Sequence, residues 1–287
     1  MKRLCLAGAL LVALLLVPSS SALAAPHHPT GEYAQFNDCP LSNPAVIDCL
    51  YSESSAGFFQ IGKKTVPLKN PVKLQGGLDE ILTPSKFFPA EDGNSLPGVA
   101  QPVPGGLLGI TAPTWWPSFL QNLFNETINN GFTGVTATVE LTSQTGVTIN
   151  PLNLLLEQGT ALSLPAKIKL SNPFLGSNCY IGSSSNPVVL AFTTGTTAPP
   201  PPNTPISGSA GTAETNEAGT ILTLSGGKLV NNSYAAPGAS GCGGLFSFLI
   251  DPFVNEIVGV PSAAGHNTAI LEGKIQLAQA EAVKASE

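Results

Sequence analysis

Two stretches of alternating apolar and polar residues constrain this fold more than any other feature of the chain. In residues 135–142 every odd position is apolar and every even position is polar, and residues 161–171 alternate in the same manner. Such a period of two places successive side chains on opposite faces of a strand, one against a core and one in water. Pro165 removes a backbone donor from the second stretch, so we expect that strand at a sheet edge or with a bulge.

Shorter runs between glycines and prolines extend the β pattern over most of the chain. Ser225-Gly226-Gly227 separates two of these runs and is typical of a hairpin turn. The further strands are expected at residues 57–61, 72–75, 187–194, 219–224, 228–234 and 268–278. The sequence therefore predicts an all-β or β-dominated fold, an antiparallel β-sandwich or open barrel with two short packed helices.

The two predicted helices differ from the rest of the chain in their period. Residues 117–130 begin at a proline and place Phe119, Leu120, Leu123, Phe124 and Ile128 on one apolar stripe. That stripe is expected to pack against the core. The second helix, residues 251–258, is expected to begin at an N-capping Asp251 and to end at Gly259.

The first residues of the chain predict its compartment. A basic start at residues 1–3 precedes an uncharged apolar run, and Ala22-Leu23-Ala24 supplies the small residues of a cleavage site. We therefore expect a signal peptide at 1–24, a flexible mature N-terminus at 25–35, and one β-rich domain at 36–287 with Pro/Gly-rich loops at 84–113 and 194–205. The mature protein is then secreted, extracellular or at the cell surface, with no transmembrane segment.

The charge of the mature chain argues against several partners. Cleavage removes Lys2 and Arg3 and leaves ten lysines against 18 acidic residues, a net charge of −8 with no arginine. An acidic, charge-poor surface offers no electrostatic footprint for nucleic acid. The lack of arginine also removes the bidentate guanidinium contacts that commonly bind phosphate and carboxylate ligands.

Four cysteines remain after cleavage, an even number that in an exported chain indicates two disulfides. Cys39 and Cys49 lie close together near the N-terminus, which favours the pairs Cys39–Cys49 and Cys179–Cys242. A zinc site is the competing interpretation. It is disfavoured because the chain contains no C-x-x-C pair.

Few residues could carry catalysis or bind a ligand. His266 is the only histidine outside the expected flexible terminus, and there is no G-x-S-x-G elbow for a hydrolase to use with it. We therefore assign no catalytic residue, and we expect no metal or cofactor. Trp115 and Trp116 are the only tryptophans. We favour burial of this pair beside the first helix, with exposed glycan or lipid binding as the alternative.

Several runs of the chain resemble a group of secreted actinobacterial proteins that have no assigned activity. These are residues 170–182, 199–206, 238–244 and 259–268. The resemblance implies secretion and an extracellular or cell-surface setting, and it implies no catalytic residue. The sequence thus predicts a secreted, disulfide-bonded, non-enzymatic protein that acts at the cell envelope or extracellularly on an unknown partner. The alternatives are a secreted hydrolase that uses His266, or glycan or lipid binding through Trp115 and Trp116.

Overall fold

The computed structural model describes residues 28–80, 85–130 and 132–287. The strands are β1 (Asp48–Ile61), β2 (Lys64–Pro67), β3 (Val72–Leu78), β4 (Ser85–Pro89), β5 (Gln101–Pro102), β6 (Thr136–Leu141), β7 (Thr148–Ile149), β8 (Leu162–Ser171), β9 (Tyr180–Ile181), β10 (Val188–Phe192), β11 (Thr212–Thr215), β12 (Ile221–Asn231), β13 (Ala239–Ser240) and β14 (Thr268–Gln279). The helices are α1 (Ser118–Asn129), α2 (Pro151–Leu156), α3 (Ser247–Val258) and α4 (Ala280–Ala285), with 3-10 turns η1 (Gly31–Phe36), η2 (Gly106–Leu108), η3 (Gln144–Gly146) and η4 (Gly244–Phe246).

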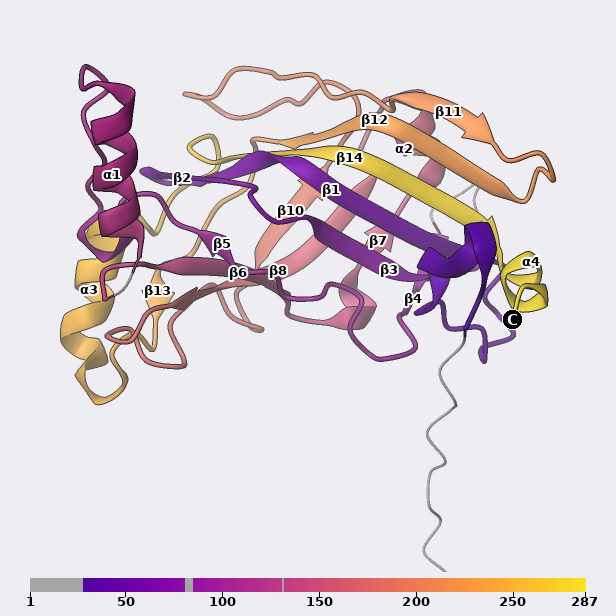
Figure 1. Cartoon of the computed structure of the whole chain (residues 1–287), viewed down its shortest axis with the longest axis horizontal. Helices are drawn as coiled ribbons and strands as arrows, with labels where there is room; N and C mark the ends of the chain where they lie inside the picture. The colour runs from indigo at the N-terminus through magenta and orange to yellow at the C-terminus, as the bar shows by residue number, and fades with distance from the viewer. Residues whose placement is uncertain (1–27, 81–84, 131) are drawn as a thin grey trace, which may run out of the picture.

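The antiparallel sheet curls into a partly closed barrel. The long strands β12, β14, β1 and β3 form one layer, and β8 with its neighbours lies behind them (Figure 1). Strand β4 joins the layers because it pairs with both β3 and β7. On the opposite side, Thr193 and Val230 exchange two backbone hydrogen bonds of 3.0 and 2.9 Å, which link the end of β10 to β12. The β-dominated fold predicted from the sequence is confirmed.

The core fills the space between the layers. The alternation in β8 follows the prediction, since each of Leu162, Leu164, Ala166, Ile168 and Leu170 is buried and the residues between them are partly exposed. Leu271 and Leu277 of β14 belong to the same apolar cluster from the facing layer. A smaller apolar cluster around Phe36 and Val283 covers the end of the barrel at which η1 and α4 lie.

The expectation that Pro165 marks an edge strand or a bulge is wrong, since β8 pairs through Pro165 with β10 without a register shift. Strand β8 has neighbours on both sides, β10 on one and β6 and β7 on the other. The carbonyl of Pro165 accepts the backbone N–H of Thr142 at 2.9 Å, just beyond the end of β6. Because the N and O of one residue point to the same side of an antiparallel strand, the missing donor faces the gap between β6 and β7.

The predicted hairpin at residues 225–227 is also wrong. Strand β12 runs unbroken through these glycines beside β14, and its register shifts between Ser225 and Gly227. Gly226 has a φ of 68°, the left-handed conformation that glycine adopts without strain. An extra residue therefore forms a β-bulge, which bends the strand around the barrel instead of reversing it.

Two segments expected to lack regular structure contain some. Within 84–113, strands β4 and β5 join the sheet, and Phe87 and Val103 are buried in the core. Part of the 25–35 segment forms η1, which ends at the buried Phe36. The predicted signal peptide at 1–24 and His27 lie outside the described residues, whereas His28 is described and exposed.

Both predicted helices form, with one change of boundary. Helix α1 matches its prediction closely. Helix α3 starts at Ser247, four residues before the expected cap, and carries Pro252 inside it. Asp251 instead accepts the backbone N–H groups of Gly241 at 3.2 Å and Cys242 at 2.7 Å, so it fixes the preceding loop rather than the helix start.

Two disulfides are present, Cys39–Cys49 and Cys179–Cys242, with Cα atoms 5.4 and 4.1 Å apart. This pairing is the one favoured from the sequence. Disulfides persist in oxidising compartments, so they fit an extracellular protein. Among the described residues, the helices are all too short or too polar to cross a membrane.

Candidate functional site

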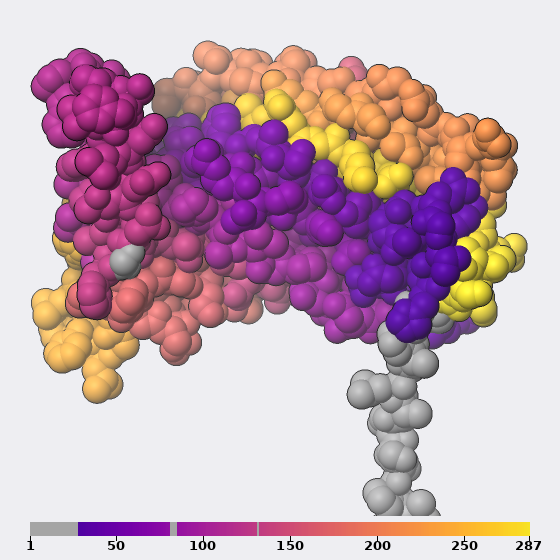
Figure 2. Space-filling model, viewed as in Figure 1, coloured from indigo at the N-terminus to yellow at the C-terminus, as the bar shows by residue number. Residues whose placement is uncertain are grey.

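One end of the molecule concentrates the exposed apolar side chains. Helices α1 and α3 project from this end of the barrel, above and below its axis (Figures 1 and 2). Thirteen of the 18 large apolar residues that are exposed within the described chain belong to the segments that build it. We call this set the apolar end: Leu108, Ile110, Trp115, Phe119, Leu120, Leu123, Phe132, Phe174, Leu245, Phe246, Phe248, Leu249 and Phe253. Scattered exposed apolar residues are normal, whereas a concentration of them marks an interaction site.

Helix α1 turns only part of its apolar stripe toward the protein, contrary to the expectation that the whole stripe packs on the core. None of its residues is buried, and Phe119 and Leu123 are 67% and 60% exposed. The covered side of the helix is mixed, because Phe124 and Ile128 lie there beside two polar residues. Asn125 Oδ1 accepts the backbone N–H of Ala112 at 3.0 Å, and Gln121 Nε2 donates to the carbonyl of Trp116 at 2.7 Å. The apolar stripe is therefore divided between the covered and the solvent-exposed side of the helix.

The two tryptophans stand at the start of this helix and have different surroundings. Trp115 is 81% exposed, so the burial favoured from the sequence does not hold for it. Trp116 is partly covered and meets the ring of Phe124 edge to face, with centroids 5.6 Å apart. Trp116 thus anchors the helix, while Trp115 extends the apolar surface into solvent.

Sequence reasoning missed the second half of the apolar end, on η4 and α3. Leu245 is 94% exposed and Phe248 is 70% exposed, whereas Val254 is the one buried residue of α3. The mostly apolar run 245–250 was a signal in the sequence that could have found it. A run with so little burial is stable only if other contacts hold the backbone in place.

The disulfide and two loops supply those contacts. The backbone N–H of Gly243 donates to the carbonyl of Leu175 at 2.7 Å, beside the Cys179–Cys242 bridge. Asn172 Nδ2 donates to the carbonyl of Phe132 at 2.8 Å, and the rings of Phe132 and Phe174 lie 6.4 Å apart. Three segments distant in sequence are thereby fixed as one surface.

The segments of the apolar end carry little charge. Residues 105–134 contain one charged side chain, Glu126, and residues 172–182 contain none. Residues 239–259 contain two charged side chains. Asp251 accepts a hydrogen bond from the backbone of the loop before α3, and Glu256 forms an ion pair with Lys63 at 2.8 Å. The surface therefore offers burial of apolar area and almost no electrostatic attraction.

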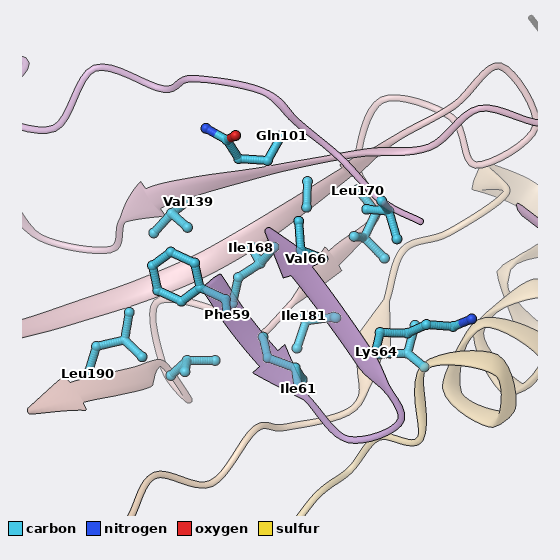
Figure 3. A pocket seen from close by; sticks show the side chains of 14 residues that line it. Phe59, Ile61, Lys64, Val66, Gln101, Val139, Ile168, Leu170, Ile181 and Leu190 are labelled. Atoms are coloured by element: carbon cyan, nitrogen blue, oxygen red, sulfur yellow. The ribbon is translucent and has the colours of Figure 1, made fainter. Parts of the chain in front are cut away.

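An apolar cavity of about 60 Å³ lies inside the barrel next to this end. Strands β1, β2, β6, β8 and β10 line it, and Phe59, Ile61 and Val139 point into the same space (Figure 3). Only Lys64 and Gln101 among its 14 lining residues are polar. The amide of Gln101 is engaged elsewhere, with Lys69 and Asn70. A cavity without polar partners for water stays dry and takes apolar ligands.

A second apolar cavity, of about 40 Å³, lies beside the first one. It lies beneath α3 and shares Lys64, Val103, Leu170 and Val258 with the first cavity. Phe253, which is 48% exposed at the apolar end, also lines it. The second cavity therefore lies between the first cavity and the apolar end.

Lys64 is the one cationic group at these cavities. Its Nζ donates to the carbonyl of Gly109 at 3.0 Å, and no carboxylate of the described chain pairs with it. Burial lowers the pKa of the Lys64 ammonium because desolvation disfavours its charged form. The adjacent Lys63 differs, since its ammonium is exposed and paired with Glu256.

A larger pocket of about 280 Å³ lies between β10 and β12, and its lining is more polar. Its threonine hydroxyls serve the local loop. Thr196 shares a hydrogen bond with Ser207 at 2.8 Å, and Thr197 Oγ1 accepts the backbone N–H of Ile206 at 3.0 Å. These two threonine hydroxyls are engaged, whereas the buried Nδ2 of Asn231, which also lines the pocket, has no hydrogen-bond partner in the described chain.

His266 lies exposed in the loop before β14. In the described part of the chain, no serine or carboxylate bonds to its imidazole, and no three His, Cys, Asp or Glu residues group as metal ligands. The four cysteines of the described residues are taken up by the disulfides. Comparison with protein-family models, curated proteins and solved structures finds no match to this chain.

Proposed function

We propose that this chain is a secreted, non-enzymatic protein of the cell envelope that docks on a neutral lipid surface through its apolar end. The observation that carries this proposal is the apolar end itself, where 13 of the 18 exposed large apolar residues of the described chain gather on segments with little charge. Secretion and the similarity to secreted actinobacterial proteins remain predictions from the sequence. The disulfides support an extracellular setting.

A lipid surface suits this end better than a protein partner for two reasons. First, the exposed residues project from two separate helices and their loops, and insertion into a fluid surface needs no matching shape (Figure 2). Second, Trp115 stands among aliphatic and phenylalanine side chains, and tryptophan is enriched where apolar and polar phases of a membrane meet.

The scarcity of charge identifies the class of lipid. The segments of the apolar end contain three carboxylates and no lysine. A protein that recognised anionic lipids would need a basic patch, since each lysine or arginine near such a surface adds about 1 kcal/mol. We therefore infer binding to uncharged or zwitterionic lipid, driven by apolar burial and insensitive to salt.

Vesicle flotation with phosphatidylcholine tests the proposal. The mature protein is expected to float with the vesicles at low and high salt, with a blue shift of Trp115 emission. Leu245→Ser/Phe248→Ser is expected to weaken partitioning at least about tenfold, because burying each side chain contributes roughly 1.5–3 kcal/mol and about 1.4 kcal/mol is tenfold. Both side chains are mostly exposed, so the variant keeps the fold.

The matched control replaces Leu155 and Leu156 of α2 by serine. These residues are 40% and 57% exposed but lie away from the apolar end (Figure 1). This control is expected to float like the wild type. Equal flotation of the L245S/F248S variant would overturn the proposal. A wild-type dimer that this variant dissociates, with no vesicle binding, would identify the end as a contact between two copies and would also overturn it.

A further inference from the structure

We propose that the polar pocket between β10 and β12 binds one neutral sugar ring. This pocket shares no residue with the apolar end, so the inference adds a second site to the proposed function. Three observations support it: a volume of about 280 Å³, a lining without charged side chains, and a buried amide donor of Asn231 that lacks a partner.

The amide of Asn231 is the strongest of these observations. Its side chain is almost fully buried, with the residue 3% exposed, and its Oδ1 accepts the backbone N–H of Ser233 at 3.0 Å. This hydrogen bond fixes which atom of the amide is the oxygen. Nδ2, on the other side of the amide, has no partner in the described chain. Because a buried donor without a partner is costly and rare, an acceptor from a ligand in the pocket would account for it.

The remaining lining combines a small apolar face with hydroxyl groups. Val189 and Ala191 alternate with buried residues of β10 and so lie on its outer face. Thr160 and Ser233 are exposed, and their hydroxyls form no hydrogen bond within the described chain. A sugar ring matches such a lining, because it carries hydroxyls at its edge and C–H groups on its faces.

The charge and the volume of the pocket narrow the ligand class further. Its lining contains no lysine, aspartate or glutamate, so a charged ligand would lose water there without gaining a counter-ion. A cavity of about 150 Å³ holds one benzene, and the pocket of about 280 Å³ therefore takes roughly twice as many non-hydrogen atoms. That is the size of one hexose. A free hexose and the terminal unit of a glycan share this chemistry.

NMR titration of the mature protein with glucose, galactose and mannose, each as the free sugar and as its methyl glycoside, tests the site. At least one of these hexoses is expected to bind. Binding of the methyl glycoside would identify the terminal unit of a glycan as the source, and binding of the free sugar alone would identify a free monosaccharide. The matching uronic acid, which adds a carboxylate to the same ring, should bind at least about tenfold more weakly, a difference of about 1.4 kcal/mol.

Two variants test the residues of the pocket. Asn231→Asp keeps an oxygen for the N–H of Ser233 and removes the NH₂ group, so it should weaken binding at least about fivefold. Ala191→Leu fills part of the pocket and should abolish binding. Ala191 is only partly covered, so this variant keeps the fold. Ala213→Leu is the matched control, because it makes the same change on the exposed strand β11 and should bind like the wild type.

Thermal unfolding identifies which variants are folded, and one folded pocket variant suffices. Absence of binding by every hexose and glycoside, equal binding of the matching uronic acid, or unchanged binding by a folded N231D or A191L variant would overturn the inference. Vesicle flotation is independent of these results. A191L should still float with phosphatidylcholine, because its apolar end is unchanged.

Discussion

Loss of the Cys179–Cys242 disulfide is expected to destabilise the protein more than loss of Cys39–Cys49. The two bridges join cysteines that are 63 and 10 residues apart. The loop-entropy relation gives stabilisations of about 4.3 and about 2.7 kcal/mol for these separations at 25 °C. All four of these cysteines are buried, so the lost packing of sulfur is similar for the two pairs. A difference of about 1.6 kcal/mol therefore remains from the loop entropy.

Urea unfolding in non-reducing buffer measures this difference with two alanine double variants, C179A/C242A and C39A/C49A. The free energy of unfolding in water is extrapolated for each variant with that variant's own m-value, the slope against urea concentration, and is compared with that of the wild type. The first variant should lose about 4.3 kcal/mol and the second about 2.7 kcal/mol. An equal or larger loss for C39A/C49A would refute the reasoning, because chain entropy would then not control the stability of either bridge.

The position of the Cys179–Cys242 disulfide also has a consequence for function. Cys242 precedes η4, and the loop of Cys179 carries Phe174, so this bridge holds two parts of the apolar end together. C179A/C242A should therefore bind phosphatidylcholine vesicles less tightly than C39A/C49A at a temperature where both are folded. Equal vesicle binding would show that hydrogen bonds such as Gly243 N–H to Leu175 O suffice to position these segments.

Two further predictions concern the sheet. Gly57→Ala should lower stability by roughly 2–6 kcal/mol, since Gly57 has a φ of 115° and an added Cβ would lie 2.0 Å from the carbonyl oxygen of Ile270. Gly93→Ala, at a φ of 74° with open space around it, is the control and should cost only backbone strain of about 1 kcal/mol in the same urea assay. Burial raises the pKa of the Asp48 carboxyl above 3.8, so the folded state binds its proton more tightly than the unfolded state does. This carboxylate therefore destabilises the fold above its folded pKa, and the effect fades as pH falls toward 3.8. Asp48→Asn should unfold at a higher urea concentration than the wild type at pH 7, and an advantage that grew on acidification would contradict this sign.

The strands and helices were predictable wherever the local pattern was strong. Residues 161–171 and 268–278 alternate in the sequence, and β8 and β14 follow them closely. The period of residues 117–130 likewise predicted α1. The glycines at 225–227 misled the prediction, because a glycine pair permits a turn or a bulge and the adjacent strand β14 selected the bulge.

The candidate site was predictable only in part. Trp115 and Trp116 were named as ligand-binding candidates, but their sequence neighbours are similar and only the packing of Phe124 distinguishes them. The cavities draw on residues from β1 to α3, and no local pattern reports that Lys64 meets Gly109. Such contacts depend on how the barrel closes.

By itself, the sequence determined the β-dominated class, the two disulfide pairs and the existence of helix α1, because periodicity and cysteine spacing are local properties. Only the tertiary structure decided which side of α1 meets solvent. The hydrogen bonds of Gln121 and Asn125 to the preceding loop, and the packing of Phe124 on Trp116, fix which side of the helix is covered. Phe119, Leu120 and Leu123 are left exposed for that reason, and the proposed docking surface includes them.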